Sequence, residues 1–352
     1  MRVLVLCAFL LLSYAVSASD LILARQVTLE SKSLGEEREL LIRLPDGYAP
    51  EKATYPVLYL LHGQWDMLPA LSTLDLLADE IPDFIVVGIQ SKGPELKPVK
   101  GEFTPFTRFL TQELVPYIKQ HYATAPFSIL SGHSNSGRFV MDRWLANDPQ
   151  FSQFYAFSPS LDDGYIVERV METSPESLPN RAPLVITIAS EGEHMQAPFD
   201  KLAQTLEQQP ELDFSFQKFP EQSHRTTKHP SMQFALQTTF KGWEPSYETK
   251  VGGLDGLTSH YSNLSKQFGF RVDVPTETLQ KLTAYYAISE DKDAVDSLNQ
   301  IISFTLKQSE TGSDALFEIA DYLSANGYEE AGESVLKGIC SEANELIKRC
   351  GS

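Results

Sequence analysis

Four short and nearly uninterrupted apolar runs constrain the fold of this 352-residue chain more than any other feature, and they cover residues 56–61, 84–89, 127–130 and 184–189. Such runs are typical of strands that are buried on both faces in the middle of a parallel sheet. Stretches with helical spacing of apolar residues accompany them, over 106–122, 137–146 and 199–208. This alternation predicts an α/β fold, a mostly parallel sheet flanked by helices.

Shorter strands are expected at both ends of this region. Residues 26–34 and 38–44 alternate between polar and apolar, which predicts an antiparallel edge hairpin with one solvated face. A last short strand is expected at 216–219.

The strongest chemical signal follows the third apolar run, where the chain reads Ser131-Gly132-His133-Ser134-Asn135-Ser136-Gly137. A serine on a tight turn between a buried strand and a helix forms a nucleophile elbow, whose crowded backbone needs small residues two positions before and after the serine. Gly132 and Ser136 meet that requirement. The pattern predicts that Ser134 is a catalytic nucleophile. The alternative is a Gly/Ser-rich loop that only caps the next helix.

A second element, His62-Gly63-Gln64, follows the first apolar run. In a sheet of this kind, two backbone N–H groups bind the oxyanion of the transition state, one from the residue after the nucleophile and one from the loop after an earlier strand. These positions predict Asn135 and Gln64 as the donors. The following residues, Trp65, Asp66 and Met67, are expected to line the substrate pocket. The alternative for the His-Gly pair is a purely structural turn.

A general base is expected after the nucleophile in the chain. His224 lies just beyond the last predicted strand, and His229 is the second candidate. The acid that orients the base is expected after the run at 184–189, where Glu191 and Glu193 both occur. Spacing does not separate these two carboxylates. Surface histidines and solvated loop charges are the alternatives.

At these motifs the chain resembles the putative esterase family of bacterial α/β-hydrolases, a group that includes esterase D and the siderophore trilactone esterases. The resemblance covers about residues 26–243, and it is carried by segments 59–63, 109–118, 132–134, 157–160 and 223–224. It implies an α/β-hydrolase fold and hydrolysis of carboxylic esters through an acyl-enzyme. It also implies a catalytic set of Ser134, His224 and Glu191 rather than Glu193.

The chain departs from the family pattern at two places. Ser136 replaces the glycine of many members, and the loop at 90–95 lacks their Asn- and Arg-rich stretch. Within the family, the motifs of this chain are most similar to those of the trilactone esterases. Some of these enzymes work with a serine–histidine dyad, which leaves open whether Glu191 has a catalytic role. Siderophore-type lactones or small acyl esters are therefore the substrates that the resemblance implies.

Two other classes of function remain open. A binding protein can keep a hydrolase scaffold without catalytic turnover and bind its partner through its C-terminal helices. A peptidase or amidase uses the same catalytic set. The intact Ser134, His224 and oxyanion loop favour an ester hydrolase over a binding protein.

The chain carries a formal charge of −18 with a pI of about 4.8, and no cluster of Lys and Arg with interleaved aromatic residues occurs in it. Repulsion from phosphates disfavours nucleic-acid binding. The sequence has neither a cluster of metal ligands nor a glycine-rich phosphate loop, so no metal ion or organic cofactor is expected. The expected partner is a small-molecule ester.

The N-terminus is typical of a cleavable secretory signal, with Met1-Arg2, an apolar run over 3–12 and small residues at 15–18. We expect cleavage after Ala18, no membrane span in the mature chain, and a periplasmic or secreted location. The apolar run is short for the alternative, an uncleaved anchor. The mature chain keeps Cys340 and Cys350, either as a disulfide suited to an oxidising compartment or as free thiols near a helix end.

We expect a signal peptide at 1–18, a catalytic domain at 19–245, a linker at 246–274 and an all-helical tail at 275–352. In the tail, apolar positions repeat at an interval of 37 residues, and residues 326–331 resemble the turn of a tetratricopeptide repeat, which predicts two helical hairpins. Two units are too few for a free-standing solenoid, so the tail should pack on the catalytic domain or mediate a homo-oligomer.

Overall fold

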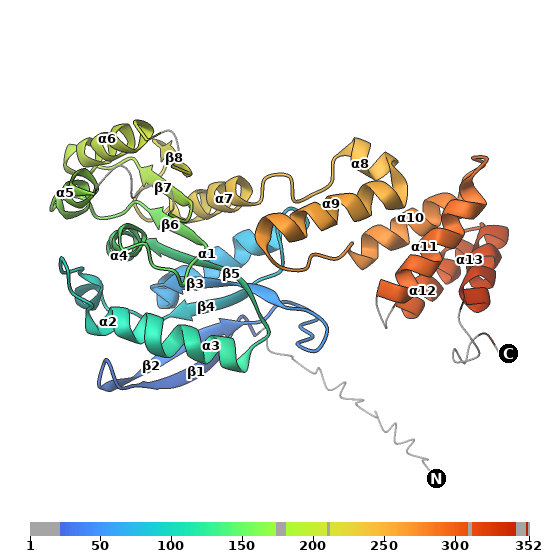
Figure 1. Cartoon of the computed structure of the whole chain (residues 1–352), viewed down its shortest axis with the longest axis horizontal. Coiled ribbons are helices and arrows are strands. Elements are labelled where there is room, and N and C mark those ends of the chain that lie inside the picture. The colour runs from blue at the N-terminus through green and yellow to red at the C-terminus, as the bar shows by residue number, and fades with distance from the viewer. Residues whose placement is uncertain (1–21, 174–180, 210–211, 309–311, 343–349, 351–352) are drawn as a thin grey trace, which may run out of the picture.

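A central eight-stranded sheet organises the computed structural model, which describes residues 22–173, 181–209, 212–308, 312–342 and 350 (Figure 1). The predicted signal at 1–18 lies outside the described residues. The strand order is β1-β2-β4-β3-β5-β6-β7-β8. The strands are β1 (Arg25–Ser31), β2 (Glu36–Arg43), β3 (Tyr55–Leu61), β4 (Ile85–Ile89), β5 (Thr124–His133), β6 (Gln153–Phe157), β7 (Leu184–Ala189) and β8 (Phe214–Phe219).

The pairing of the strands confirms the prediction of a mostly parallel sheet. Strand β2 is antiparallel to both β1 and β4, so that β1 and β2 form an edge hairpin. Strands β3 to β8 all run parallel to one another. The arrangement is that of an α/β-hydrolase fold. Because the carboxyl ends of these six strands lie along one edge, the residues that follow them meet there.

Helices cover both faces of the sheet (Figure 1). Leu61 and Leu60 point to opposite faces, because neighbouring strand residues alternate, and each joins a different apolar core. One core contains residues of α2 (Pro105–Arg108), the π-helical segment Phe109–Leu114, α3 (Val115–His121), α4 (Asn135–Leu145), α5 (Tyr165–Glu172) and α6 (Glu193–Glu207). The other core contains residues of α1 (Gly63–Leu76) and α7 (Lys228–Thr239).

The expectation of a linker at 246–274 is wrong. This stretch forms α8 (Tyr247–Val251) and α9 (Gly253–Phe268). Four apolar side chains line one side of α9 at helical spacing and pack into the same core as α1 and α7: Leu257, Tyr261, Leu264 and Phe268. Burial of this apolar stripe, rather than helix propensity, explains why a polar and glycine-containing stretch folds.

Four further helices form the C-terminal tail, as predicted: α10 (Thr276–Ile288), α11 (Ala294–Gln308), α12 (Gly312–Ala325) and α13 (Glu329–Glu342). They share an apolar core of their own, while Leu279 of α10 joins the core beneath α9. The tail thus extends from the catalytic part through α9 (Figure 1). Its likeness to tetratricopeptide repeats stays a prediction. Among the described helices, none combines the length and apolarity needed to cross a bilayer.

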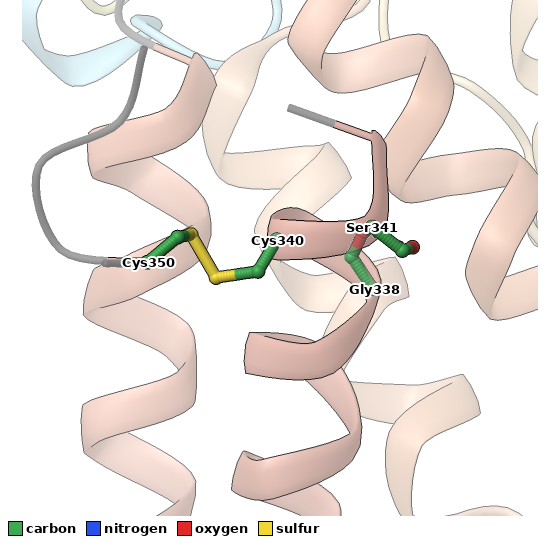
Figure 2. The surroundings of a disulfide bond; sticks show 4 residues. All are labelled: Gly338, Cys340, Ser341 and Cys350. Carbon is green, nitrogen blue, oxygen red and sulfur yellow. Dashed lines mark hydrogen bonds between the residues drawn. A yellow bond between two sulfur atoms is a disulfide. The ribbon is translucent and has the colours of Figure 1, made fainter. Parts of the chain in front are cut away.

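The two cysteines left after the predicted signal are bonded to each other. Figure 2 shows the bridge between Cys340, in α13, and Cys350, whose Cα atoms lie 5.4 Å apart. Of the two states that the sequence left open, the disulfide is the one found. Such bonds persist mainly in oxidising compartments.

Candidate active site

Four adjacent strands present polar side chains at the carboxyl edge of the sheet. Strands β5, β6, β7 and β8 are parallel neighbours, and the residues that follow them include Ser134, Ser158, Glu191 and His224 in that order. Their order along the chain is therefore also their order across the sheet. This places the predicted nucleophile, acid and base on one edge.

Ser134 occupies the turn between β5 and α4 with φ 62° and ψ −122°. A positive φ strains a residue that has a Cβ and costs about 1–3 kcal/mol, so the surrounding structure must hold the residue in place. Here the backbone N–H donates to the carbonyl of Phe157 at 3.0 Å, and the carbonyl accepts from the N–H of Ser160 at 3.1 Å. The turn has the geometry of the predicted nucleophile elbow.

The two small residues of this turn have different reasons to be small. A Cβ on Gly132 would lie 2.6 Å from the backbone of Ser136, so only glycine fits there. Ser136 is fully buried, and its hydroxyl bonds both the N–H and the carbonyl of His133 at 2.8 Å. Serine in place of the usual glycine therefore stabilises the turn rather than disturbing it.

His224 forms a hydrogen bond with Glu191. Its Nδ1 lies 2.9 Å from Oε1 of the carboxylate, and the side chains are 45% and 10% exposed. Burial opposes ionisation of Glu191, but hydrogen bonds from His224 and Ser158 outweigh it and lower the pKa of the carboxyl below its ordinary value. An ionised carboxylate only accepts, so Nδ1 of His224 carries the proton and Nε2 is free to take one.

The alternative acid and base lie elsewhere. Glu193 is the first residue of α6 and is exposed. His229 belongs to α7, and its Nδ1 contacts the hydroxyl of Thr73 at 2.8 Å. Of the candidates that the sequence left open, Glu191 and His224 are the pair that the structure brings together.

Gln64 and Asn135 leave the sheet side by side. Strands β3 and β5 pair in parallel with Leu60 opposite Ser131, and each predicted donor lies four residues further along. Gln64 is the second residue of α1 and Asn135 the first residue of α4. Neither backbone N–H has an acceptor within its helix, since the first four N–H groups of a helix lack one. Both are thus suited to bind a developing negative charge.

Trp65, Asp66 and Met67, which were expected to line the substrate pocket, differ in their surroundings, and their role in binding substrate stays a prediction. Trp65 is 62% exposed and packs edge-on against His62. Asp66 is 6% exposed and forms an ion pair with Lys228 of α7. Met67 is equally buried, in the apolar core. Because α1 begins at Gly63, its helical rotation turns the second and third of these side chains inward.

Two polar residues near the site were missed as functional candidates in the sequence. His133 is 5% exposed, and its Nε2 lies 2.7 Å from the carbonyl oxygen of His224. Ser158 is fully buried with φ 36°, and its hydroxyl accepts from the N–H of Ala189 and bonds Glu191. Their places in segments 132–134 and 157–160, which carry the family resemblance, were signals in the sequence, but their contacts join distant segments and could not be read from it.

The site is partly open to solvent, since Ser134 is half-buried and the His224 side chain is 45% exposed. The cavity that borders the elbow, lined by Asp66, Ser131, His133 and Lys228 among others, has a volume of about 10 Å³. Larger cavities of about 520, 600 and 700 Å³ include neither Ser134 nor His224 in their linings.

Comparisons with known proteins agree with this architecture. The chain is 27% identical over 168 residues to the apo-salmochelin esterase of Escherichia coli O6:H1, which covers 38% of this chain, and it spans half the length of that curated relative. An IroE-like serine hydrolase from Shewanella oneidensis has a similar fold, with a TM-score of 0.64 and 23% identity over 79% of this chain and 98% of that one.

A second solved structure extends into the tail. An uncharacterised protein from Capnocytophaga ochracea matches with a TM-score of 0.62 and 19% identity, covering 91% of this chain and 94% of that one. At these identities the two structures bear on the fold alone. The family model described as "Putative esterase" matches residues 31–226, which is more than half of the chain and includes the elbow, Glu191 and His224. The chain therefore belongs to the putative esterase family.

Proposed function

We propose that this protein is a serine esterase in which Ser134 is the nucleophile, His224 the general base and Glu191 the acid that orients the base. The observation that carries the proposal is the hydrogen bond of 2.9 Å between His224 Nδ1 and Glu191, at the same sheet edge as the strained Ser134. That bond leaves Nε2 of His224 unprotonated. A strained serine at the same sheet edge as an oriented imidazole fits the needs of acyl transfer.

The proposed reaction follows from these positions. His224 Nε2 takes the proton of Ser134 as its Oγ attacks the ester carbonyl, and the backbone N–H groups of Gln64 and Asn135 bind the oxyanion. His224 then gives the proton to the leaving alcohol oxygen. A water molecule, deprotonated by the same imidazole, attacks the acyl-enzyme and releases the acid. Because Glu191 has a lowered pKa, it stays ionised and stabilises the imidazolium at each step.

We further propose siderophore-type lactones or small acyl esters as substrates. Two features support this. The site is partly open to solvent, since the His224 side chain is 45% exposed, so a bulky ester can approach it. In addition, one relative of this chain is described as an apo-salmochelin esterase. The pattern that predicts a secretory signal at 1–18 and the Cys340–Cys350 disulfide support our proposal of a periplasmic or secreted location.

The test combines covalent labelling with turnover. The wild-type protein should be labelled at Ser134 by a fluorophosphonate and should hydrolyse p-nitrophenyl acetate; Ser134→Ala should abolish labelling and lower kcat by about four to six orders of magnitude. Ser128→Ala, in the middle of β5 and five residues before His133, is the matched control and should keep activity. Retained labelling in Ser134→Ala, or a folded wild type without turnover, would contradict the proposal.

Substrate choice is tested by a panel. Aryl esters of graded acyl length, a catecholate trilactone and a p-nitroanilide of the same acyl group should be compared by kcat/KM. We expect short esters or the trilactone to be preferred, and the anilide to react slowly. Preference for the anilide would indicate an amidase, and preference for long acyl chains would contradict small acyl esters as substrates.

A further inference from the structure

The residue just before the proposed nucleophile touches the proposed base. His133 ends β5 and is buried, with 5% of its surface exposed. Its Nε2 lies 2.7 Å from the main-chain carbonyl oxygen of His224, and the two rings pack with centroids 4.4 Å apart. One side chain thus contacts both the backbone and the ring of His224.

The loop that carries His224 needs such a contact. Residues 223–226 are all exposed, and two of the hydrogen bonds around them close the turn on itself, from Ser223 N–H to the Thr226 hydroxyl at 2.9 Å and from Thr227 N–H to the Ser223 carbonyl at 3.0 Å. Exposed loops with local bonds open readily. Glu191 fixes the imidazole ring of His224 but not its backbone, whose carbonyl is held by His133.

The direction of this hydrogen bond is determined. A carbonyl oxygen only accepts, so Nε2 of His133 carries the proton. Burial, followed by repulsion from His224 and Lys228, lowers the pKa of His133 to about 3. The ring is therefore neutral near pH 7 and has a single N–H, which is committed to His224.

We propose that His133 is a positioning residue, which binds the carbonyl of His224 through its Nε2–H and so keeps the imidazole of His224 in a fixed position relative to Ser134. This inference rests on the proposed function of Ser134 and His224. Because His133 and Ser134 are consecutive in the chain, any shift of the elbow moves the anchor of the base with it. The side chain couples the two reacting groups, and a misplacement of about 1 Å between such groups lowers rates by about 100-fold.

The first experiment compares His133→Leu, which lacks the donor, with His133→Gln, which retains an N–H donor. With p-nitrophenyl acetate we expect kcat of His133→Leu to fall about 10- to 100-fold while KM changes by less than about threefold. The glutamine variant should recover kcat to within about fivefold of wild type. Tyr155→Phe is the matched control, because it removes a buried hydrogen bond of 2.7 Å to Thr239 in the same domain and should leave kcat unchanged.

A double-mutant cycle separates positioning from structural support. Fluorophosphonate labelling rates, normalised to the folded fraction from near-ultraviolet circular dichroism, are measured for His133→Leu, His224→Ala and both together. If His133 acts through His224, its substitution changes the rate by less than about twofold once His224 is absent. An equal loss in both backgrounds, or a folded His133→Leu variant with wild-type kcat, overturns the proposal. Turnover that survives in Ser134→Ala would instead refute the proposed function itself.

Discussion

The carboxylate beside His224 gives the sharpest test of the proposed triad. Glu191 and Glu193 lie two residues apart, yet the Glu191 side chain is 10% exposed and accepts from His224 at 2.9 Å, whereas Glu193 is exposed at the start of α6. Glu191→Gln keeps the shape of the side chain but removes its charge, so Nδ1–H loses an ionic acceptor and the imidazolium loses its stabilisation.

The structure sets the size of the expected effect. Loss of the orienting acid in a well-shielded triad lowers kcat by about 10⁴-fold, or about 5 kcal/mol. Here the His224 side chain is 45% exposed, so water replaces part of what Glu191 supplies, and we expect a loss of about 10²- to 10⁴-fold. Glu193→Gln removes only a solvated charge and should change kcat by less than about tenfold.

Both variants should be assayed with p-nitrophenyl acetate for kcat and KM, beside thermal unfolding to exclude loss of folded protein. The fluorophosphonate labelling rate gives an independent measure of the Ser134–His224 pair. If the two variants behave in the reverse order, Glu193 is the acid. If both effects are mild, the enzyme works as a dyad of Ser134 and His224 that another group orients.

Two further predictions concern stability and a third concerns the role of the tail. Lys228→Met leaves the buried Asp66 carboxylate without its partner and should lower the unfolding free energy by about 3 kcal/mol in denaturant titrations, with recovery when Asp66→Leu is added; no recovery would contradict the ion-pair explanation. Burial lowers the pKa values of His62 and His133 to about 4 and about 3. As the pH is lowered below 6.5, these two histidines therefore take up protons in the unfolded chain before they do so in the folded one. The free energy of unfolding should fall between pH 6.5 and pH 4 by up to about 3 kcal/mol per imidazole. A melting temperature that stays constant over this range would refute it. Truncation after Val274 removes helices with their own core and should change kcat by less than about threefold; a monodisperse truncated protein without activity would place the tail at the site.

Much of the fold follows from local patterns that survive in any tertiary context. The apolar runs that became β3, β4, β5 and β7 are too hydrophobic to lie anywhere but in the middle of a covered sheet. The elbow around Ser134 is equally local, because its sterics depend on two small residues within the same turn. These features, together with chain order, were enough to point to Ser134 and His224.

Other elements depended on what they pack against. The stretch 246–274 is polar and contains glycine, so its pattern favoured a linker, and only the core under α1 and α7 makes α9 a helix. Strand β6, Gln153–Phe157, was missed because it is short and follows a turn. The start of α1 at Gly63 rotates Asp66 and Met67 inward, which spacing along the chain did not reveal.

The sequence by itself determined most strands of the sheet, the tight turn at Ser134 and the family to which the chain belongs. Only the tertiary structure showed that Glu191 contacts His224, joined Cys340 to Cys350, and brought His133 against the carbonyl of His224. The physical reason is the same in each case. A hydrogen bond or disulfide depends on distances of a few ångströms between segments up to 91 residues apart in the chain, and those distances are set by strand register and helix packing rather than by any local pattern.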